Sequence, residues 1–475
     1  MLSATFFMLL VDFSIVSIAL PSMERELRMT GAQGQWIVST YAIFLAGFLM
    51  LTGRCADIYG RFRFFVVGLI VFTLASLLAG LAHSGAILVT MRAIQGLGAA
   101  LVNPAALSIA LALFPPGPQR SRAVAMWGTV GTTGVAAGTL FGGILVQYLG
   151  WRSVLFVNVP VAALILALAP FYIPRDPSDV AHRRLDVFGA FLLTATLVVF
   201  VYTVESVPLT GWVSTTSVAG VAATAVLLAL FIVVERRVPE PILPARILRY
   251  PDLLSGASVV LLQPMSYAGV FVFGSVYLQR VAGFDPLVAG LAFLPSTLVT
   301  AVIAAPLTMP IARRLGVRGM GIVMGAIMVA GEAMLLFMQP GSAFKVFLAA
   351  TCVAAFGGML AYQSGMIAGL AHVEDADEGT ASAAQSFALQ LGIGLSVAFG
   401  AAAQEARTST ILRAGSSAAE ALAGGLQAAF FFSIVAGLAM MVAIIFGLRH
   451  AATAEIPLRH YLPFGKLHHR ISVRT

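Results

Sequence analysis

The stretch of sequence that decides the fold is short and charged: Gly53-Arg54-Cys55-Ala56-Asp57-Ile58-Tyr59-Gly60-Arg61-Phe62-Arg63. It separates two almost purely apolar runs, 35–52 and 64–81. Each run approaches the roughly 20 residues that a helix needs to cross a bilayer, so the pattern predicts a helical hairpin in a membrane. Three arginines at a membrane exit indicate the cytoplasmic side. Alternatively, this turn only anchors the topology.

The composition indicates a polytopic membrane protein. Of the 475 residues, 59% are hydrophobic and only 10% are charged, and the mean hydropathy is +0.95. Soluble domains carry about 25% charged residues, so a soluble globule is excluded. The net charge is +8, but the cations occur in short clusters between apolar runs, so we expect no nucleic-acid partner. Cys55 and Cys352 lie at different predicted depths, and we expect neither a disulfide nor a metal site.

The apolar runs predict an all-α fold with fourteen transmembrane helices. They begin near residues 4, 34, 64, 86, 122, 152, 186, 214, 253, 284, 318, 343, 379 and 426. Of 28 Lys and Arg, this topology places 20 in cytoplasmic turns and the tail, seven outside and Arg92 within the membrane. That bias supports the count and places both termini in the cytoplasm. The expected location is the cell membrane, either plasma or bacterial inner.

A weak internal repeat divides the chain. The segment Ala56–Arg61, after the second helix, resembles Ala312–Val317, after the tenth, in its Ala, its Gly four residues later and its basic character. We therefore expect two six-helix halves, 1–172 and 253–448, with two inserted helices in 173–252 and a cytoplasmic tail, 449–475. The connections are too short to hold a soluble domain.

Two charged residues fall inside predicted spans. Asp12 lies near the membrane midplane of the first helix, where burial favours the neutral form, so the carboxyl could bind and release a proton. Arg92 lies in the fourth helix, and a guanidinium there is costly enough to suggest function. The alternatives are that Arg92 reaches the outer interface and that Asp12 merely neutralises it.

Other polar and small residues form a longer set of candidates. Glycines at three- and four-residue spacing on the fifth helix predict close packing against a facing helix. Seven polar side chains could face a substrate cavity or equally join helices: Gln95, Gln263, Tyr267, Tyr362, Gln363, Gln385 and Gln390. Glu205 and Glu332 are left unassigned. Glu332 is expected on a peripheral helix, where it would be structural or protonated and silent.

Together these segments resemble the fourteen-helix drug:proton antiporters of the major facilitator superfamily. The likeness rests on the charged turn, on 92–100, on Asp12 with 19–21, and on 151–152 with 158–160. It implies a cytoplasmic gate at Gly53, Asp57, Gly60, Arg61 and Arg63, and proton coupling by Asp12 and Arg92. It also implies an antiporter motif at Gly134, Gly138, Thr139, Gly142 and Gly143. Thr139 stands where the family usually has a proline. Without that proline, we expect the helix to be less bent.

The expected function is proton-coupled export of lipophilic small molecules by alternating access. We expect the protein to be a monomer and to need no cofactor. A rival is a dedicated exporter of one endogenous metabolite or lipid on the same fold. An intramembrane enzyme or sensor is a remote alternative, because no cluster of nucleophile, base or metal ligands falls at membrane depth. The expected partners are the substrate, protons and the bilayer.

We predict that Asp57 docks at the start of the thirteenth helix, near Gly379 and Thr380, when the cytoplasmic side is closed. A helix N-terminus stabilises a carboxylate by about 0.3 to 1 kcal/mol. Asp57→Asn should therefore slow transport and raise the cytoplasm-open population, with little change in substrate affinity. Spin labels on the turns after the second and tenth helices measure this population, and an unchanged distance distribution would exclude the contact.

Overall fold

The computed structural model describes residues 1–113, 118–173, 186–211, 213–238, 241, 245–339, 341–374 and 378–449, and nearly all of these are helical. The first nine helices are α1 Leu2–Glu26, α2 Gly31–Tyr59, α3 Arg61–Gly80, α4 Gly85–Ala112, α5 Pro118–Leu149, α6 Ser153–Phe156, α7 Asn158–Tyr172, α8 Val187–Thr210 and α9 Thr215–Arg237. Within the described ranges, eleven helical segments are long and apolar enough to cross a membrane.

The rest of the described chain is also helical. Its elements are η1 Ala245–Arg249, α10 Pro251–Val276, η2 Tyr277–Val281, α11 Pro286–Leu298, η3 Val299–Ala304, α12 Ala305–Met334, η4 Leu335–Phe337, α13 Ala343–Leu370, α14 Glu378–Arg413 and α15 Ala418–Gly447. The α12 helix is interrupted at Gly316, where φ is 70° and ψ is 163°. Gly60, between α2 and α3, also has a positive φ of 106°. Both segments of the predicted repeat therefore contain a glycine that breaks a helix, a conformation that side chains with a Cβ disfavour.

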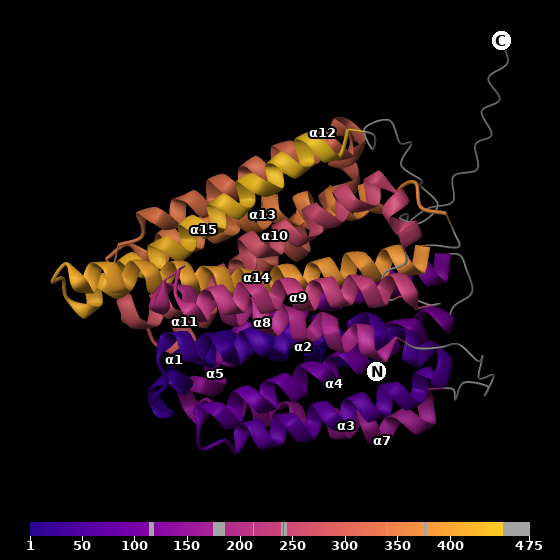
Figure 1. Cartoon of the computed structure of the whole chain (residues 1–475), viewed down its shortest axis with the longest axis horizontal. Helices are drawn as coiled ribbons and strands as arrows, with labels where there is room; N and C mark the ends of the chain where they lie inside the picture. The colour runs from indigo at the N-terminus through magenta and orange to yellow at the C-terminus, as the bar shows by residue number, and fades with distance from the viewer. Residues whose placement is uncertain are drawn as a thin grey trace, which may run out of the picture.

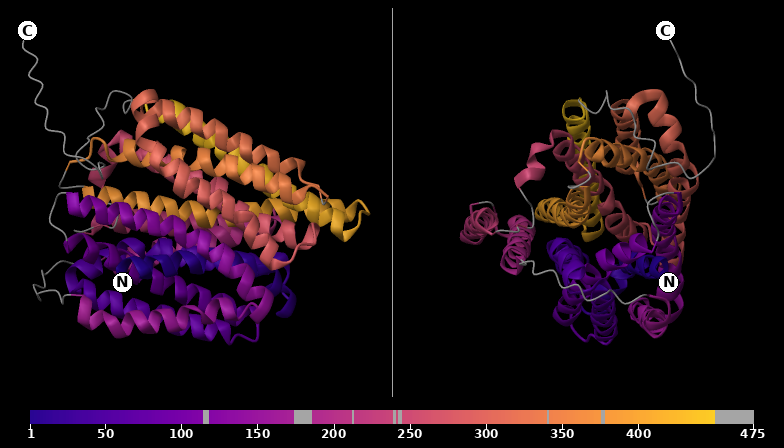
Figure 2. Two further views of the ribbon diagram at one scale, coloured as in Figure 1. Left: turned by 180° about the vertical axis from the view of Figure 1, so that it is seen from behind. Right: turned by 90° about the vertical axis from the view of Figure 1, so that its right-hand side faces the viewer.

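The long helices run roughly along one direction, with α1–α7 on one side of the molecule and α10–α15 on the other (Figure 1). The most extensive contacts between the two sides are those of α1 with α10, α2 with α14, and α5 with α11. The α8 and α9 helices pack on each other, and α8 also contacts α2 and α14. Viewed from the end, this pair lies outside the other helices (Figure 2). Few α9 side chains are buried, which suits a helix that faces lipid.

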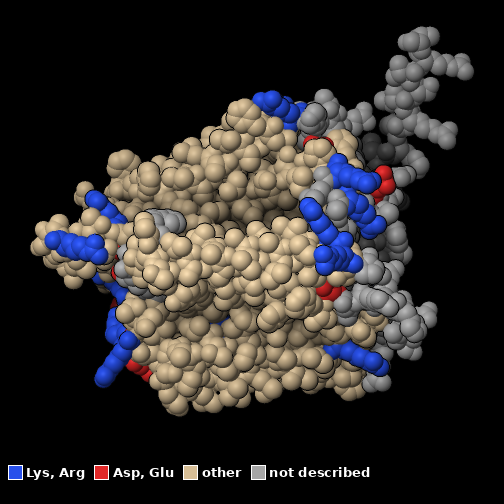
Figure 3. All heavy atoms as spheres, viewed as in Figure 1, with Lys and Arg blue, Asp and Glu red and all other residues tan. Residues whose placement is uncertain are grey.

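Charged side chains on the face shown in Figure 3 gather at the two ends of the helices. The surface between them is uncharged, and it includes exposed leucine, valine and phenylalanine side chains from α9 and α15. Such a belt is expected where a protein contacts the hydrocarbon core of a bilayer. The two ends are therefore the aqueous faces.

Most helices begin within a few residues of the predicted positions, but α15 begins at Ala418, eight residues before the predicted 426. The earlier start has a local cause, because Ser417 and Glu420 form a capping box. The Ser417 hydroxyl accepts from the Glu420 N–H, and the Glu420 carboxylate accepts from the Ser417 N–H. These bonds satisfy two backbone donors that the helix itself leaves unpaired.

Glycines allow the helix backbones to approach closely. A Cβ added to Gly138 of α5 would lie 2.7 Å from the Val11 carbonyl oxygen of α1, and one on Gly142 would lie 2.9 Å from the Ile15 Cγ1. Gly143 faces the other way, where an added Cβ would lie 2.8 Å from the Leu287 Cα of α11. The close packing predicted from the glycine spacing is therefore present. Its consequence is that α5 packs against helices from both sides of the molecule.

The α12–α13 contact offers a test of this packing. A Cβ on Gly357 would lie 2.5 Å from the Met328 backbone nitrogen, so Gly357→Ala should destabilise the protein by about 1 to 3 kcal/mol. The control is Gly319→Ala, because the nearest atom to its added Cβ is the Leu315 Cβ at 3.4 Å. Thermal unfolding in detergent should show a lower Tm for Gly357→Ala, whereas Gly319→Ala gains helix propensity and should not lower it.

Candidate functional site

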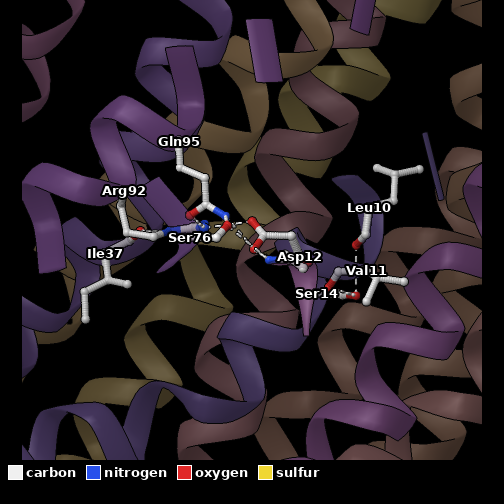
Figure 4. Close-up of polar contacts among 9 residues, drawn as sticks. Leu10, Val11, Asp12, Ser14, Ile37, Ser76, Arg92 and Gln95 are labelled. Atoms are coloured by element: carbon white, nitrogen blue, oxygen red, sulfur yellow. Dashed lines mark hydrogen bonds and ion pairs between the residues drawn. The ribbon is translucent and has the colours of Figure 1, made fainter. Parts of the chain in front are cut away.

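The most densely connected polar cluster lies around Asp12, which α1 carries close to its middle. The Arg92 Nη1 of α4 donates to the Asp12 Oδ2 at 2.7 Å, and both side chains are fully buried. The Gln95 Nε2 donates to the Asp12 Oδ1 at 2.8 Å, and the Asn158 Nδ2 of α7 donates to the same atom at 2.6 Å. Figure 4 shows Arg92 and Gln95 converging on Asp12. Three donors thus face one carboxylate, and the hydrogen bond from the guanidinium is charge-assisted.

Arg92 also has partners besides Asp12. Its Nε donates to the Ile37 carbonyl oxygen at 3.0 Å, and its Nη1 donates to the Gln95 Oε1 at 2.7 Å. The guanidinium carbon lies 4.3 Å from the centroid of the Tyr41 ring, a cation–π distance. The buried Nη2 has no hydrogen-bond partner. The cation is therefore held by acceptors that would stay in place if Asp12 became neutral.

The side chains that are hydrogen-bonded to one another in this cluster come from four helices, α1, α3, α4 and α7, and Ser76 is the residue from α3. The Ser76 hydroxyl accepts from the Gln95 Nε2 at 2.7 Å and lies 3.4 Å from the Asn158 Nδ2. Sequence reasoning paired Asp12 with Arg92 but missed Asn158 and Ser76 as partners. Ser76 is one of few polar residues in the 64–81 run, and this isolation was the available signal. Gln95, predicted to face a cavity, lies fully buried in the cluster.

The other predicted cavity residues lie on three helices, α10, α13 and α14. The Gln263 Nε2 lies 3.9 Å from the Met328 Sδ, and the Tyr267 hydroxyl lies 3.5 Å from the Thr351 carbonyl oxygen. Gln385 is fully buried, with its Nε2 3.5 Å from the Met366 carbonyl oxygen. Tyr362, Gln363 and Gln390 are half-buried. Gln390 lines a small crevice between α2, α8 and α14. That these residues contact the substrate remains a prediction.

The predicted gate is described only in part. Gly53 and Arg61 are half-buried, Arg63 is exposed, and Gly60 separates α2 from α3. The side chains of Asp57, Gly379 and Thr380 lie outside the described residues, as does that of Glu205. In the glycine motif, Gly134, Gly138 and Gly142 face α1, and Gly143 faces α11. Thr139 is fully buried, and its carbonyl oxygen lies against Gly290 of α11.

A second charged contact lies at the end opposite the 53–63 turn and, unlike the Asp12–Arg92 pair, joins the two sides of the molecule. The Arg280 Nη2 of η2 lies 2.6 Å from the Glu24 Oε2 of α1, and Glu24 is almost completely buried. The neighbouring Gln279 Nε2 donates to the Ile18 carbonyl oxygen at 3.0 Å. We refer to Glu24, Arg280 and Gln279 as the end clasp. Sequence reasoning missed it, because both charged residues lie near predicted helix ends, where charges are common.

An all-α membrane protein with a buried ion pair between spanning helices has the features of a secondary transporter. Residues 2–397 match the family description of the Major Facilitator Superfamily. The chain belongs to this superfamily, so it is a multi-pass membrane protein of a transporter family and not a member of an enzyme family.

Relatives and solved structures agree with this assignment. The chain is 35% identical to the puromycin resistance protein pur8 of Streptomyces alboniger, over 82% of this chain and 78% of that protein. It is 33% identical to the multidrug resistance protein Stp of Mycobacterium tuberculosis, over 72% of this chain but only 63% of Stp. The fold resembles the POT family transporter PepTSo, with a TM-score of 0.68, 15% identity and coverage of 93% and 96% of the two chains.

The end clasp gives a prediction about conformation. A hydrogen-bonded charge contact is worth about 1.5 to 3 kcal/mol, and 1.4 kcal/mol is about a tenfold change in a two-state ratio. Arg280→Gln should therefore separate the ends of α1 and η2 and raise the population open at this end by about tenfold. Spin labels at His83→Cys and Gly341→Cys, with the native cysteines replaced, measure this opening.

The matched control is Arg152→Gln at the same end of the molecule. Arg152 pairs with Glu26, and both partners belong to the α1–α7 side. Loss of this exposed pair should leave the label distances unchanged. If both variants shift the distances equally, the Arg280 contact does not control opening.

Proposed function

We propose that this chain exports lipophilic small molecules, drugs and antibiotics among them, in exchange for protons. The observation that carries the proposal is the buried Asp12–Arg92 pair with its three donors to Asp12. Relatives named for multidrug, puromycin, tetracenomycin C and lincomycin resistance support the substrate class. The absence of a cofactor and the monomeric state remain expectations of the same proposal.

We infer fourteen transmembrane helices from three observations. Eleven segments qualify by length and composition, and one of them, Pro286–Phe337, spans 52 residues and is interrupted at Gly316. The α2 and α5 helices, of 29 and 32 residues, are long enough to cross as well. We propose six-helix halves at 1–172 and 253–448, an inserted pair within 173–252, and cytoplasmic termini. Alternating access would then move one half against the other across the pairs α1–α10, α2–α14 and α5–α11.

The geometry around Asp12 suggests how a proton could drive this motion. A proton on Asp12 would remove the negative charge that faces Arg92, and the ion pair would be lost. Removing one partner of a buried pair usually costs about 3 to 5 kcal/mol, because the other charge is left uncompensated. Here Ile37, Gln95 and the Tyr41 ring already contact Arg92 and would limit that cost. Proton binding would thus loosen α1 from α4 without leaving the arginine unsolvated.

A dedicated exporter of one metabolite is the second candidate. It is favoured by relatives whose names specify one compound, such as the cephamycin export protein CmcT of Amycolatopsis lactamdurans, which is 38% identical over 62% of each chain. Growth of a drug-sensitive strain that expresses the chain, on a panel of lipophilic compounds, separates the candidates. Protection against several unrelated compounds supports multidrug export, and protection against one supports the dedicated exporter.

Asp12→Asn should abolish proton-driven efflux in proteoliposomes with an imposed pH gradient. The amide retains the shape of the side chain but loses the charge that pairs with Arg92 and binds the proton. The control is Asp285→Asn, the same substitution at an exposed residue before α11, which should transport normally. If Asp12→Asn still shows efflux driven by the pH gradient, Asp12 does not couple transport to protons.

A further inference from the structure

Glu332 of α12 is the second acid that the structure buries completely in the helix bundle. Both of its carboxyl oxygens lie 2.8 Å from the Ser266 Oγ of α10. The same Oγ lies 2.7 Å from the Ser433 carbonyl oxygen of α15. Gly437 of α15 provides the space, since an added Cβ there would lie 3.2 Å from the Glu332 Oε2 and 3.0 Å from the Ser266 Oγ. Three helices thus enclose the carboxyl group.

The protons available to these contacts can be counted. A serine hydroxyl donates one proton, and a backbone carbonyl or an ionised carboxylate donates none. If Glu332 were ionised, a single proton would serve three oxygens around the Ser266 Oγ. If Glu332 is protonated, its O–H donates to the Ser266 Oγ, and the Ser266 O–H donates to the Ser433 carbonyl oxygen. The neutral acid therefore supplies the donor that the ionised form lacks.

The charges around Glu332 agree with this count. Within the described part of the chain, no Arg, Lys or His forms an ion pair with Glu332. The titratable neighbour of Glu332 is Tyr267 of α10, which also lies near Cys352 of α13, and neither of these residues is a cation in any protonation state. An isolated buried carboxylate is costly and ordinarily takes up a proton. Asp12 differs, because Arg92 and two amide groups donate to it.

The position of Glu332 matches a position in the Asp12 cluster. Ser76 follows the helix-breaking Gly60 by sixteen residues, and Glu332 follows the helix-breaking Gly316 by the same interval. Both residues lie on the helix after the break. Ser76 makes polar contacts to α4 and α7, and Glu332 contacts Ser266 of α10, which in turn contacts α15. The repeat therefore places two polar clusters at related positions, and only the first contains a cation.

We propose that Glu332 is a second proton-binding site, which is occupied in this conformation. The bound proton joins α12 to α10 and, through Ser266, to α15. The site is separate from the Asp12–Arg92 pair, and its protonation does not depend on the proposed transport function. A neutral acid also predicts that Glu332→Gln leaves efflux of neutral substrates nearly unchanged, because the amide replaces the acid without adding a charge.

Infrared difference spectroscopy of the purified, substrate-free protein at neutral pH tests the proposal. Wild type should show the C=O stretching band of a protonated carboxylic acid, and Glu332→Gln should lose this band. Ser266→Ala should keep the band but shift it, because the acid loses the oxygen that accepts its proton. Asp12→Asn is the matched control and should leave the band in place. If wild type and Glu332→Gln have the same spectrum in this region, Glu332 is ionised and the proposal is wrong.

Thermal unfolding gives a second readout. Glu332→Gln should have a Tm at least equal to that of wild type at neutral pH, because its amide is neutral in both the folded and the unfolded chain. Wild type must instead take up a proton on folding. A marked loss of stability in Glu332→Gln, together with an unchanged Tm in Ser266→Ala, would contradict the proposed hydrogen bonds. Both measurements are made without substrate, so a failure of the transport proposal would not affect them.

Discussion

The rest of the structure depends on the ion pair between Asp12 and Arg92. A bilayer offers these charges no water, so the protein has to supply every partner itself. It supplies most of them by bringing α1, α3, α4 and α7 to one point, where Asn158 and Gln95 complete the hydrogen bonds to Asp12, while the Arg92 Nη2 stays unpaired. Removing either charge would leave the other buried without its partner. The need to satisfy this pair therefore constrains the position of four helices, of which α1 and α7 are far from α3 and α4 in the sequence.

Close helix packing connects that pair to the remainder of the molecule. The glycine face of α5 lets it rest on α1 at Gly138, while Gly143 brings the opposite face against α11. In addition, α1 contacts α10 directly, and its end is held by Arg280. A displacement of α1 at Asp12 would thus change its contacts with helices on both sides of the molecule. This is a physical route by which a change of one proton could alter the contact between them, because tightly packed elements move as units.

Sequence reasoning succeeded where one strong physical rule applied. Bilayer thickness fixes the length of an apolar helix, and the cost of a buried charge singles out Asp12 and Arg92. It was weaker for neutral polar residues. Ser76 and Asn158 resemble ordinary helix-joining residues, and the apolar pattern of a spanning helix does not say which face turns inward. The pattern therefore left Gln95 between a cavity-facing and a helix-joining role, and the structure buries it beside Asp12. The contact of Glu24 with Arg280 joins distant parts of the chain and could not be read from local spacing.

The two buried acids show that depth alone does not set the charge of a carboxyl group. Asp12 and Glu332 are equally inaccessible to solvent. Asp12 faces donors from Arg92, Gln95 and Asn158, so the ionised form is satisfied and a proton must compete with an arginine for it. Glu332 faces one hydroxyl that is already required by a carbonyl group, so the neutral form satisfies more contacts. A proton is therefore a competitor at the first site and a structural ligand at the second. Of the two acids, Asp12 is the one whose protonation would change the surrounding contacts, and this supports its proposed role in driving motion.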